Sequence, residues 1–148
     1  MRSPHDRGAA PQKATHPLTI LAQAYRVSGK PELAHETVSR ALNIEGSRQE
    51  RALEAWAMAV MAGVNADLGR LEHAIDWYRC GLSQAAELSM PPLTAHCHLG
   101  LGQLLLATGH SAEACNEINA AIDLYYSMGI KFWLPQAEAA LAKGNKTI

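Results

Sequence analysis

Apolar residues recur three and four positions apart along most of the chain, which is the spacing of a helix with one buried face. Leu18, Leu21, Ala22 and Tyr25 show this spacing near the start. No segment shows the alternation of apolar and polar residues that indicates a strand. The pattern therefore predicts an all-α chain, with helices over residues 16–28, 31–45, 49–67, 71–89, 93–107, 111–127 and a final one over about 131–143.

The helical pattern repeats every forty residues. A glycine recurs at this step, with a small residue seven positions before it and an alanine five positions after it. Such a glycine suits a left-handed turn at the end of a helix, and small residues let two helices approach closely. The repeat predicts three helical hairpins, over about 15–48, 55–88 and 95–128. The residues expected to have these structural roles are Ala22, Gly29, Ala34, Ala62, Gly69, Ala74, Gly102, Gly109 and Ala114.

These positions resemble the tetratricopeptide repeat, although that repeat is ordinarily 34 residues long. The first copy carries the resemblance best, through Leu18, Leu21, Ala22, Tyr25, Ala34, Val38 and Ala41. The resemblance implies a right-handed α-solenoid of three hairpins with a C-terminal capping helix.

Repeats of this greater length are similar to the C-terminal tails of bacterial regulators that carry an ATPase module, often with an adenylate cyclase or a LuxR-type DNA-binding domain. The sequence does not contain the phosphate-binding motif G-x-x-x-x-G-K-[ST] of an ATPase. The glycine-containing stretch LGLGQLLLATG lacks the lysine of this motif. The resemblance therefore implies a non-catalytic module that binds proteins or transmits a signal, as the tail of a larger bacterial regulator.

In tetratricopeptide proteins the first helix of each hairpin lines an inner, concave surface. The resemblance assigns twelve residues of this chain to that surface, and a protein or peptide is the ligand it implies. A solvent-exposed face with no ligand is the alternative. The twelve residues are His16, Thr19, Gln23, Arg26, Trp56, Ala59, Gly63, Asp67, His96, Leu99, Gln103 and Leu106.

Histidines and cysteines are concentrated between residues 95 and 115 and raise the question of a metal site. His96, Cys97 and His98 are consecutive, so on a helix each points about 100° away from the next. His110 and Cys115 fall near the following turn, at the other end of that helix. Zinc needs its ligands to converge on one point. We therefore predict no metal and no cofactor, and a small His/Cys metal protein or enzyme is the less favoured alternative.

Composition narrows the function further. The formal net charge is −1, and no Lys or Arg lies between Arg79 and Lys131, which argues against binding of nucleic acid. Apolar runs are too short for a membrane span. Three cysteines without a C-x-x-C motif suggest a reducing compartment, and hence the cytoplasm. Residues 1–14, rich in proline and scattered charge, are expected to be a disordered leader before a repeat domain over 15–148.

Two further surfaces could contact a partner. The first hairpin has no predecessor, so its apolar residues Leu18, Leu21, Tyr25 and Leu33 could support a homodimer. Near the end, Tyr125, Tyr126, Phe132 and Trp133 form an aromatic cluster. Docking of the terminal helix is the favoured role for this cluster, and a partner anchor is the alternative.

Overall fold

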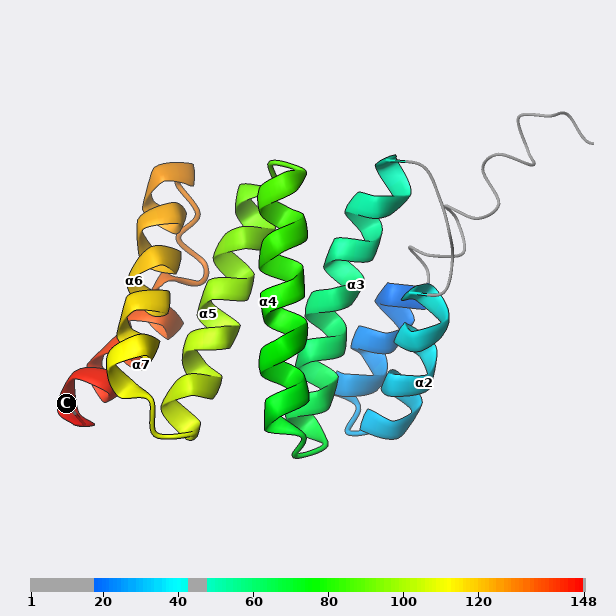
Figure 1. The fold of residues 1–148 in the computed structure, drawn as a ribbon, viewed down its shortest axis with the longest axis horizontal. Helices are drawn as coiled ribbons and strands as arrows, with labels where there is room; N and C mark the ends of the chain where they lie inside the picture. The colour runs from blue at the N-terminus through cyan, green and yellow to red at the C-terminus, as the bar shows by residue number, and fades with distance from the viewer. Residues whose placement is uncertain (1–17, 43–47, 148) are drawn as a thin grey trace, which may run out of the picture.

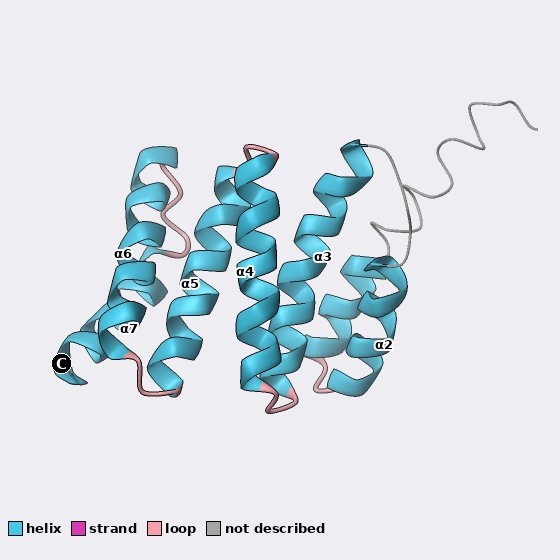
Figure 2. Cartoon of the chain, viewed as in Figure 1, coloured by secondary structure: helices cyan, strands magenta, loops and turns pink. Residues whose placement is uncertain are grey.

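The computed structural model describes residues 18–42 and 48–147, and these residues form helices joined by short loops (Figure 2). No strand occurs in this part of the chain, so the predicted all-α class is confirmed. A first helix spans residues 18–27. The other helices are α2 (Pro31–Leu42), α3 (Arg48–Asp67), α4 (Leu71–Glu87), α5 (Pro91–Ala107), α6 (Ser111–Met128) and α7 (Leu134–Thr147).

The helices follow one another across the molecule in chain order (Figure 1). Within hairpins α3 packs on α4 and α5 on α6, while α2 packs on α3 and α4 on α5 between hairpins. The last helix, α7, packs on α6 and α5. The predicted stack of three hairpins closed by a terminal helix is therefore confirmed.

Small residues allow the close packing of the two helices in each hairpin. Ala22, Ala62 and Ala74 have no exposed surface. In the third hairpin the approach is closest at Gly102, where a Cβ atom would lie 2.5 Å from Cγ1 of Ile118 and 3.2 Å from the carbonyl oxygen of Ala114. The recurring alanines, and Gly102 in the third hairpin, are thus contact points between helices.

Glycine ends the first helix of each hairpin. Gly29, Gly69 and Gly109 have φ values of 76°, 78° and 86°, in the left-handed region that glycine adopts without strain. After the third of them, the His110 N–H donates to the carbonyl of Leu105 at 2.8 Å. This bond is the 6→1 bond of a Schellman cap and satisfies a carbonyl that the helix leaves free.

Helix α4 ends in the same geometry without a glycine. Ser89 has φ 53°, and the N–H of Met90 donates to the carbonyl of Ala85 at 2.8 Å. A residue with a Cβ atom is strained in this conformation by about 1–2 kcal/mol. We expect Ser89→Gly to raise the free energy of unfolding by about 0.5–1 kcal/mol, because the added flexibility of the unfolded chain offsets part of the relief.

Urea denaturation checks this expectation, with Ser83→Gly as the control. Ser83 is exposed in the interior of α4, where glycine should lower the stability by about 0.5 kcal/mol. Equal losses for the two variants would show that Ser89 carries no strain.

Several helix ends differ from the sequence prediction, including the start of α5 and both ends of α7, which extends to Thr147 rather than to residue 143. Helix α5 begins at Pro91 and not at residue 93, because a proline in the first turn lacks only an N–H that the helix does not use. Helix α7 begins at Leu134 and not at 131, because Phe132 and Trp133 form a turn before it. The predicted leader over 1–14, and His16 with it, lie outside the described residues.

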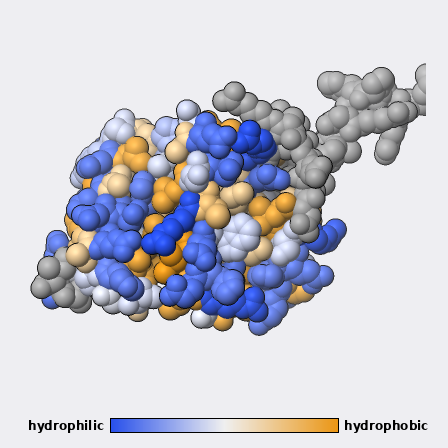
Figure 3. Space-filling model, viewed as in Figure 1, coloured by the Kyte–Doolittle hydropathy of each residue, from blue (hydrophilic) through white to orange (hydrophobic). Residues whose placement is uncertain are grey.

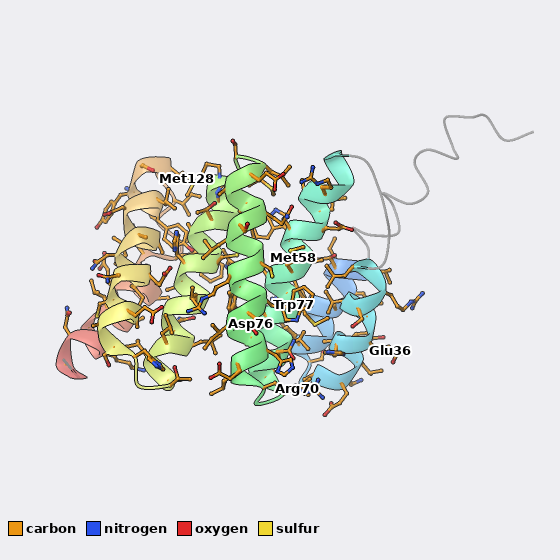
Figure 4. The ribbon with its side chains drawn as sticks, viewed as in Figure 1. Glu36, Met58, Arg70, Asp76, Trp77 and Met128 are labelled. Carbon is orange, nitrogen blue, oxygen red and sulfur yellow. The ribbon has the colours of Figure 1, made fainter. Side chains whose placement is uncertain are left out.

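Helices α2, α4 and α6 form the outer face, which is largely hydrophilic with scattered hydrophobic residues (Figure 3). Trp77 of α4 lies on the side toward α3 (Figure 4) and packs against apolar clusters of both the first and the second hairpin. None of the described helices is long and apolar enough to span a membrane.

Candidate functional site

A cavity of about 510 Å³ lies on the inner helices, and we call it the inner groove. Its lining comes from the first helix, α3, α5, the end of α6 and the turn before α7. Because both ends of the stack contribute, the array curves around the groove. Six of the residues predicted for the concave surface line it, namely Thr19, Gln23, Arg26, Trp56, Ala59 and His96.

A row of rings crosses the groove. The centroid of the His96 ring lies 6.1 Å from that of Trp56, at an interplanar angle of 40°. On its other side His96 meets Trp133 at 6.0 Å and 64°. The three rings come from α3, α5 and the turn before α7, and their separations fall within the range of favourable aromatic contacts. Three adjacent elements of the stack thus present one continuous aromatic surface.

Arg26 is held by other residues predicted for this surface. Its Nε donates to Asp67 Oδ2 at 2.7 Å, and Nη1 donates to Gln23 Oε1 at 3.3 Å. A Cβ atom at Gly63 would collide with the guanidinium, so the missing side chain gives Arg26 its place. Gly63 and Asp67 therefore position Arg26, and the arginine charge is neutralised at the edge of the groove.

Leu99 and Gln103, which the resemblance assigned to the concave surface, do not line the inner groove. Leu99 is 2% exposed and belongs to a core cluster with Ile118 and Leu134, because α7 packs over this part of α5. Gln103 and Leu106 line a second cavity, of about 750 Å³, together with residues of α7. The packing of α7 therefore separates these residues from the groove.

Seven lining residues were not among those assigned to the concave surface from the sequence, although the aromatic cluster named there includes Tyr125 and Trp133. Trp133 follows Leu53 and Leu93 at the forty-residue step, so continuing the repeat past the third hairpin would have placed it with the inner helices. Tyr125 is in phase with the fully buried Ala85, and its sequence position indicates only a core residue. The seven are Ile20, Leu53, Val60, Pro92, Tyr125, Ile130 and Trp133.

The Tyr125 side chain lies at the border of the core and the groove. The residue is 2% exposed, and its hydroxyl has no hydrogen-bond partner within the described part of the chain. Burial raises the pKa of Tyr125 to about 12, so the hydroxyl is neutral. The aromatic cluster also holds α7 in place, since the exposed Tyr126 donates to Glu138 of α7 at 3.2 Å.

Burial, and secondarily the charge of Arg26, lower the pKa of His96 below its ordinary value of 6.5. Between the pKa of His96 in the folded protein and about 6.5, the unfolded chain binds more protons than the folded protein. The contribution of His96 to the free energy of unfolding is therefore fully present above this pH range and is lost as the pH falls through it. We expect the melting temperature to decrease below about pH 6.5, in part through His96.

Melting curves from pH 8 to pH 5 test this contribution. His96→Gln should have a weaker pH dependence than the unmodified protein, while His73→Gln, on the exposed side of α4, should keep the full dependence. Identical curves for His96→Gln and the unmodified protein would contradict the assignment.

The histidines and cysteines of residues 95–115 separate in the fold. Nδ1 of His98 lies 2.6 Å from Glu117 Oε2 and ties α5 to α6. His110 lies at the turn and contacts the Thr108 hydroxyl at 3.0 Å. Cys97 is buried, which raises the pKa of its thiol to about 12. Among the described residues no group of three or more His, Cys, Asp or Glu could hold a metal ion.

Comparison with known proteins identifies the fold. No family model and no curated protein matches the sequence. Among solved structures, the apo form of RapI matches with a TM-score of 0.84 and 15% sequence identity. The match covers 90% of this chain and 49% of RapI, so the chain spans about half the length of that protein. The two proteins therefore share a fold, a tetratricopeptide-like stack of helical hairpins.

Proposed function

We propose that this chain is a non-catalytic module that binds a protein or peptide segment in the inner groove. The observation that carries the proposal is the row formed by Trp56, His96 and Trp133 across three neighbouring elements of the stack. Tryptophan is among the residues that contribute most to binding energy at protein interfaces. The likeness to RapI supports the fold that such a surface needs.

Recognition would rest on burial of apolar surface and on shape. Besides the aromatic row, the groove presents aliphatic side chains such as Ile20, Val60 and Ile130. Arg26 already pairs with Asp67, so a ligand carboxylate would have to compete for it. The groove therefore favours a segment with large apolar side chains over a charged chain terminus.

Chemistry on a bound substrate is not part of the proposal. Arg26, His96 and Tyr125 are the ionisable groups in the described lining. The first is paired with Asp67, and the ring of the second packs between two tryptophans. These arrangements support binding rather than acid–base or nucleophilic catalysis.

We further infer that the module transmits the state of its groove to other parts of a larger regulator. Its span of about half of RapI is consistent with a module of a longer chain. Association with an adenylate cyclase has no support from the comparisons and stays a prediction. Self-association through the first hairpin also stays an alternative, and Ile20 and Leu21, which are 56% and 42% exposed, favour it.

A peptide display library selected on the unmodified protein tests the proposal. We expect enriched sequences with two or more large apolar residues, and a loss of at least about tenfold in their affinity for Trp56→Ala. Val27→Ser is the matched control, because Val27 is 82% exposed and lies outside the groove lining. If the selected peptides bound Trp56→Ala and Val27→Ser with the same affinity as the unmodified protein, recognition would lie elsewhere and the proposal would be refuted.

A further inference from the structure

Helix α7 lies at one end of the stack (Figure 1) and keeps the register of the first helices of the hairpins. Leu141 and Ala142 follow Leu101 and Gly102 at the forty-residue step. The packing agrees with this register, since α5 packs on α4 and α3 of the preceding hairpin, and α7 packs in the same way on α6 and α5. Helix α7 therefore has the position of a fourth first helix.

One face of α7 is uncovered. Ala137, on the side toward the third hairpin, has no exposed surface. Glu138, Ala142 and Asn145 are exposed, and their spacing places them together on another side of the helix, which we call the open face of α7. In the three hairpins, by contrast, the position of Ala142 is buried. The residues at this position are Ala22, Ala62 and Gly102.

The second helix of each hairpin covers the corresponding face. In the third hairpin, α6 places Ile118 and the backbone oxygen of Ala114 against Gly102. No described helix packs on the open face of α7 in this way. The second helices share a pattern, with small residues seven positions apart and Val, Tyr or Ile between them. A helix of this pattern therefore fits the open face. The residues of the pattern are Ala34, Val38 and Ala41, then Ala74, Tyr78 and Gly81, then Ala114, Ile118 and Ala121.

The charge of the open face adds a further requirement. Glu138 is in the repeat position of His98, and Nδ1 of His98 lies 2.6 Å from Oε2 of Glu117 on α6. Glu117 comes three residues after Ala114, so an incoming helix would place the residue at this point of its pattern opposite Glu138. The Glu138 carboxylate accepts a hydrogen bond from the Tyr126 hydroxyl at 3.2 Å and has further acceptor positions. Lys or Arg is therefore favoured there, and Glu is repelled.

We propose that the open face of α7 binds an amphipathic helix of a partner protein. This helix has small residues seven positions apart, an aliphatic residue or tyrosine between them, and Lys or Arg three positions after the first small residue. It would pack against α7 as α6 packs against α5. None of the three residues of the open face lines the inner groove, so this inference does not depend on the function proposed above.

A fluorescently labelled peptide of residues 111–128 that carries Glu117→Lys is the probe, because α6 already has the required pattern. Fluorescence anisotropy should show saturable binding with a Kd on the order of 100 µM, since one helix buries less surface than the roughly 1,200 Å² of a stable complex. Ala142→Gln should weaken binding at least about tenfold, because the longer side chain would hold the two helices apart. Absence of saturable binding, or equal binding to Ala142→Gln, would overturn the proposal.

Ala139→Gln is the matched control. Ala139 is also exposed on α7, but it lines the second cavity and does not belong to the open face. Its substitution should leave the affinity unchanged, and an equal loss in Ala139→Gln and Ala142→Gln would place the peptide in that cavity and contradict the proposal. Binding that is lost in Trp56→Ala would place the peptide in the inner groove, with the same consequence. The peptide selection is scored at Trp56 and this binding at Ala142, so failure of one does not imply failure of the other.

Exchange of charges tests the contact with Glu138. The unmodified protein should bind the Glu117→Lys peptide about fivefold more tightly than the natural sequence of residues 111–128. The Glu138→Lys variant should prefer the natural sequence instead. An unchanged preference for the Glu117→Lys peptide in this variant would show that the two positions do not face each other, and the proposed pairing would be refuted. Melting curves verify that the variants are folded, as expected for substitutions at exposed positions.

Discussion

Replacing Leu101 with alanine should lower the free energy of unfolding by about 2–5 kcal/mol. Leu101 is 2% exposed and lies in a core cluster that joins α3, α4, α5 and α6. The shorter side chain would leave a cavity that the surrounding helices fill only in part. Urea unfolding followed by circular dichroism measures the loss.

Leu21→Ala is the matched control, since Leu21 is in the same position of the first repeat. It is 42% exposed, because no earlier hairpin covers it in the described structure, and the expected loss is about 1 kcal/mol or less. An equal loss for both variants in a monomeric sample would contradict the prediction. An equal loss that disappears on dilution would instead support self-association through the first hairpin.

Gly102→Ala should destabilise the protein by about 1–3 kcal/mol. Alanine stabilises a helix by about 1 kcal/mol relative to glycine. The expected loss of stability is therefore opposite in sign to the effect of helix propensity. The new methyl group would lie 2.5 Å from Cγ1 of Ile118 and 3.2 Å from the backbone oxygen of Ala114. Both neighbours are buried, so α5 and α6 would have to separate. Chemical denaturation checks the sign.

Gly63→Ala provides the comparison, because the three atoms nearest to its methyl group would all belong to the flexible end of the Arg26 side chain. Loss of the exposed pair with Asp67 costs about 1 kcal/mol at most, so the net effect should be near zero. Adding Ile118→Val to Gly102→Ala should restore part of the stability, since the first hairpin has Ala22 and Val38 at these positions. If Gly102→Ala and Gly63→Ala were equally stable, a loss of stability in Gly102→Ala could not be attributed to close helix packing at Gly102.

Much of the fold could be predicted from the sequence because its signals are local. The spacing of apolar residues depends on the helical repeat alone, and a left-handed turn favours glycine whatever surrounds it. Gly29, Gly69 and Gly109 thus indicated the three turns, each with positive φ. Ser89 gave no such signal, because its left-handed conformation is imposed by the packing of α4 and α5 around it.

The candidate site could be predicted only in part. Thr19, Gln23, Arg26, Trp56 and His96 share one cavity because the repeat fixed their register on successive inner helices. Leu99 has the same register, but α7 covers it. The helical period predicts which face of a helix a residue lies on, but it does not predict which neighbouring element covers that face.

The sequence by itself determined the helices, the turns between them and the forty-residue register, since these depend on residues near one another in the chain. Only the tertiary structure decided where the surface is open. The curvature of the stack brings Trp133 beside His96 and places Tyr125, near the end of α6, in the lining of the groove. These are contacts between distant segments, and the packing of whole hairpins sets them.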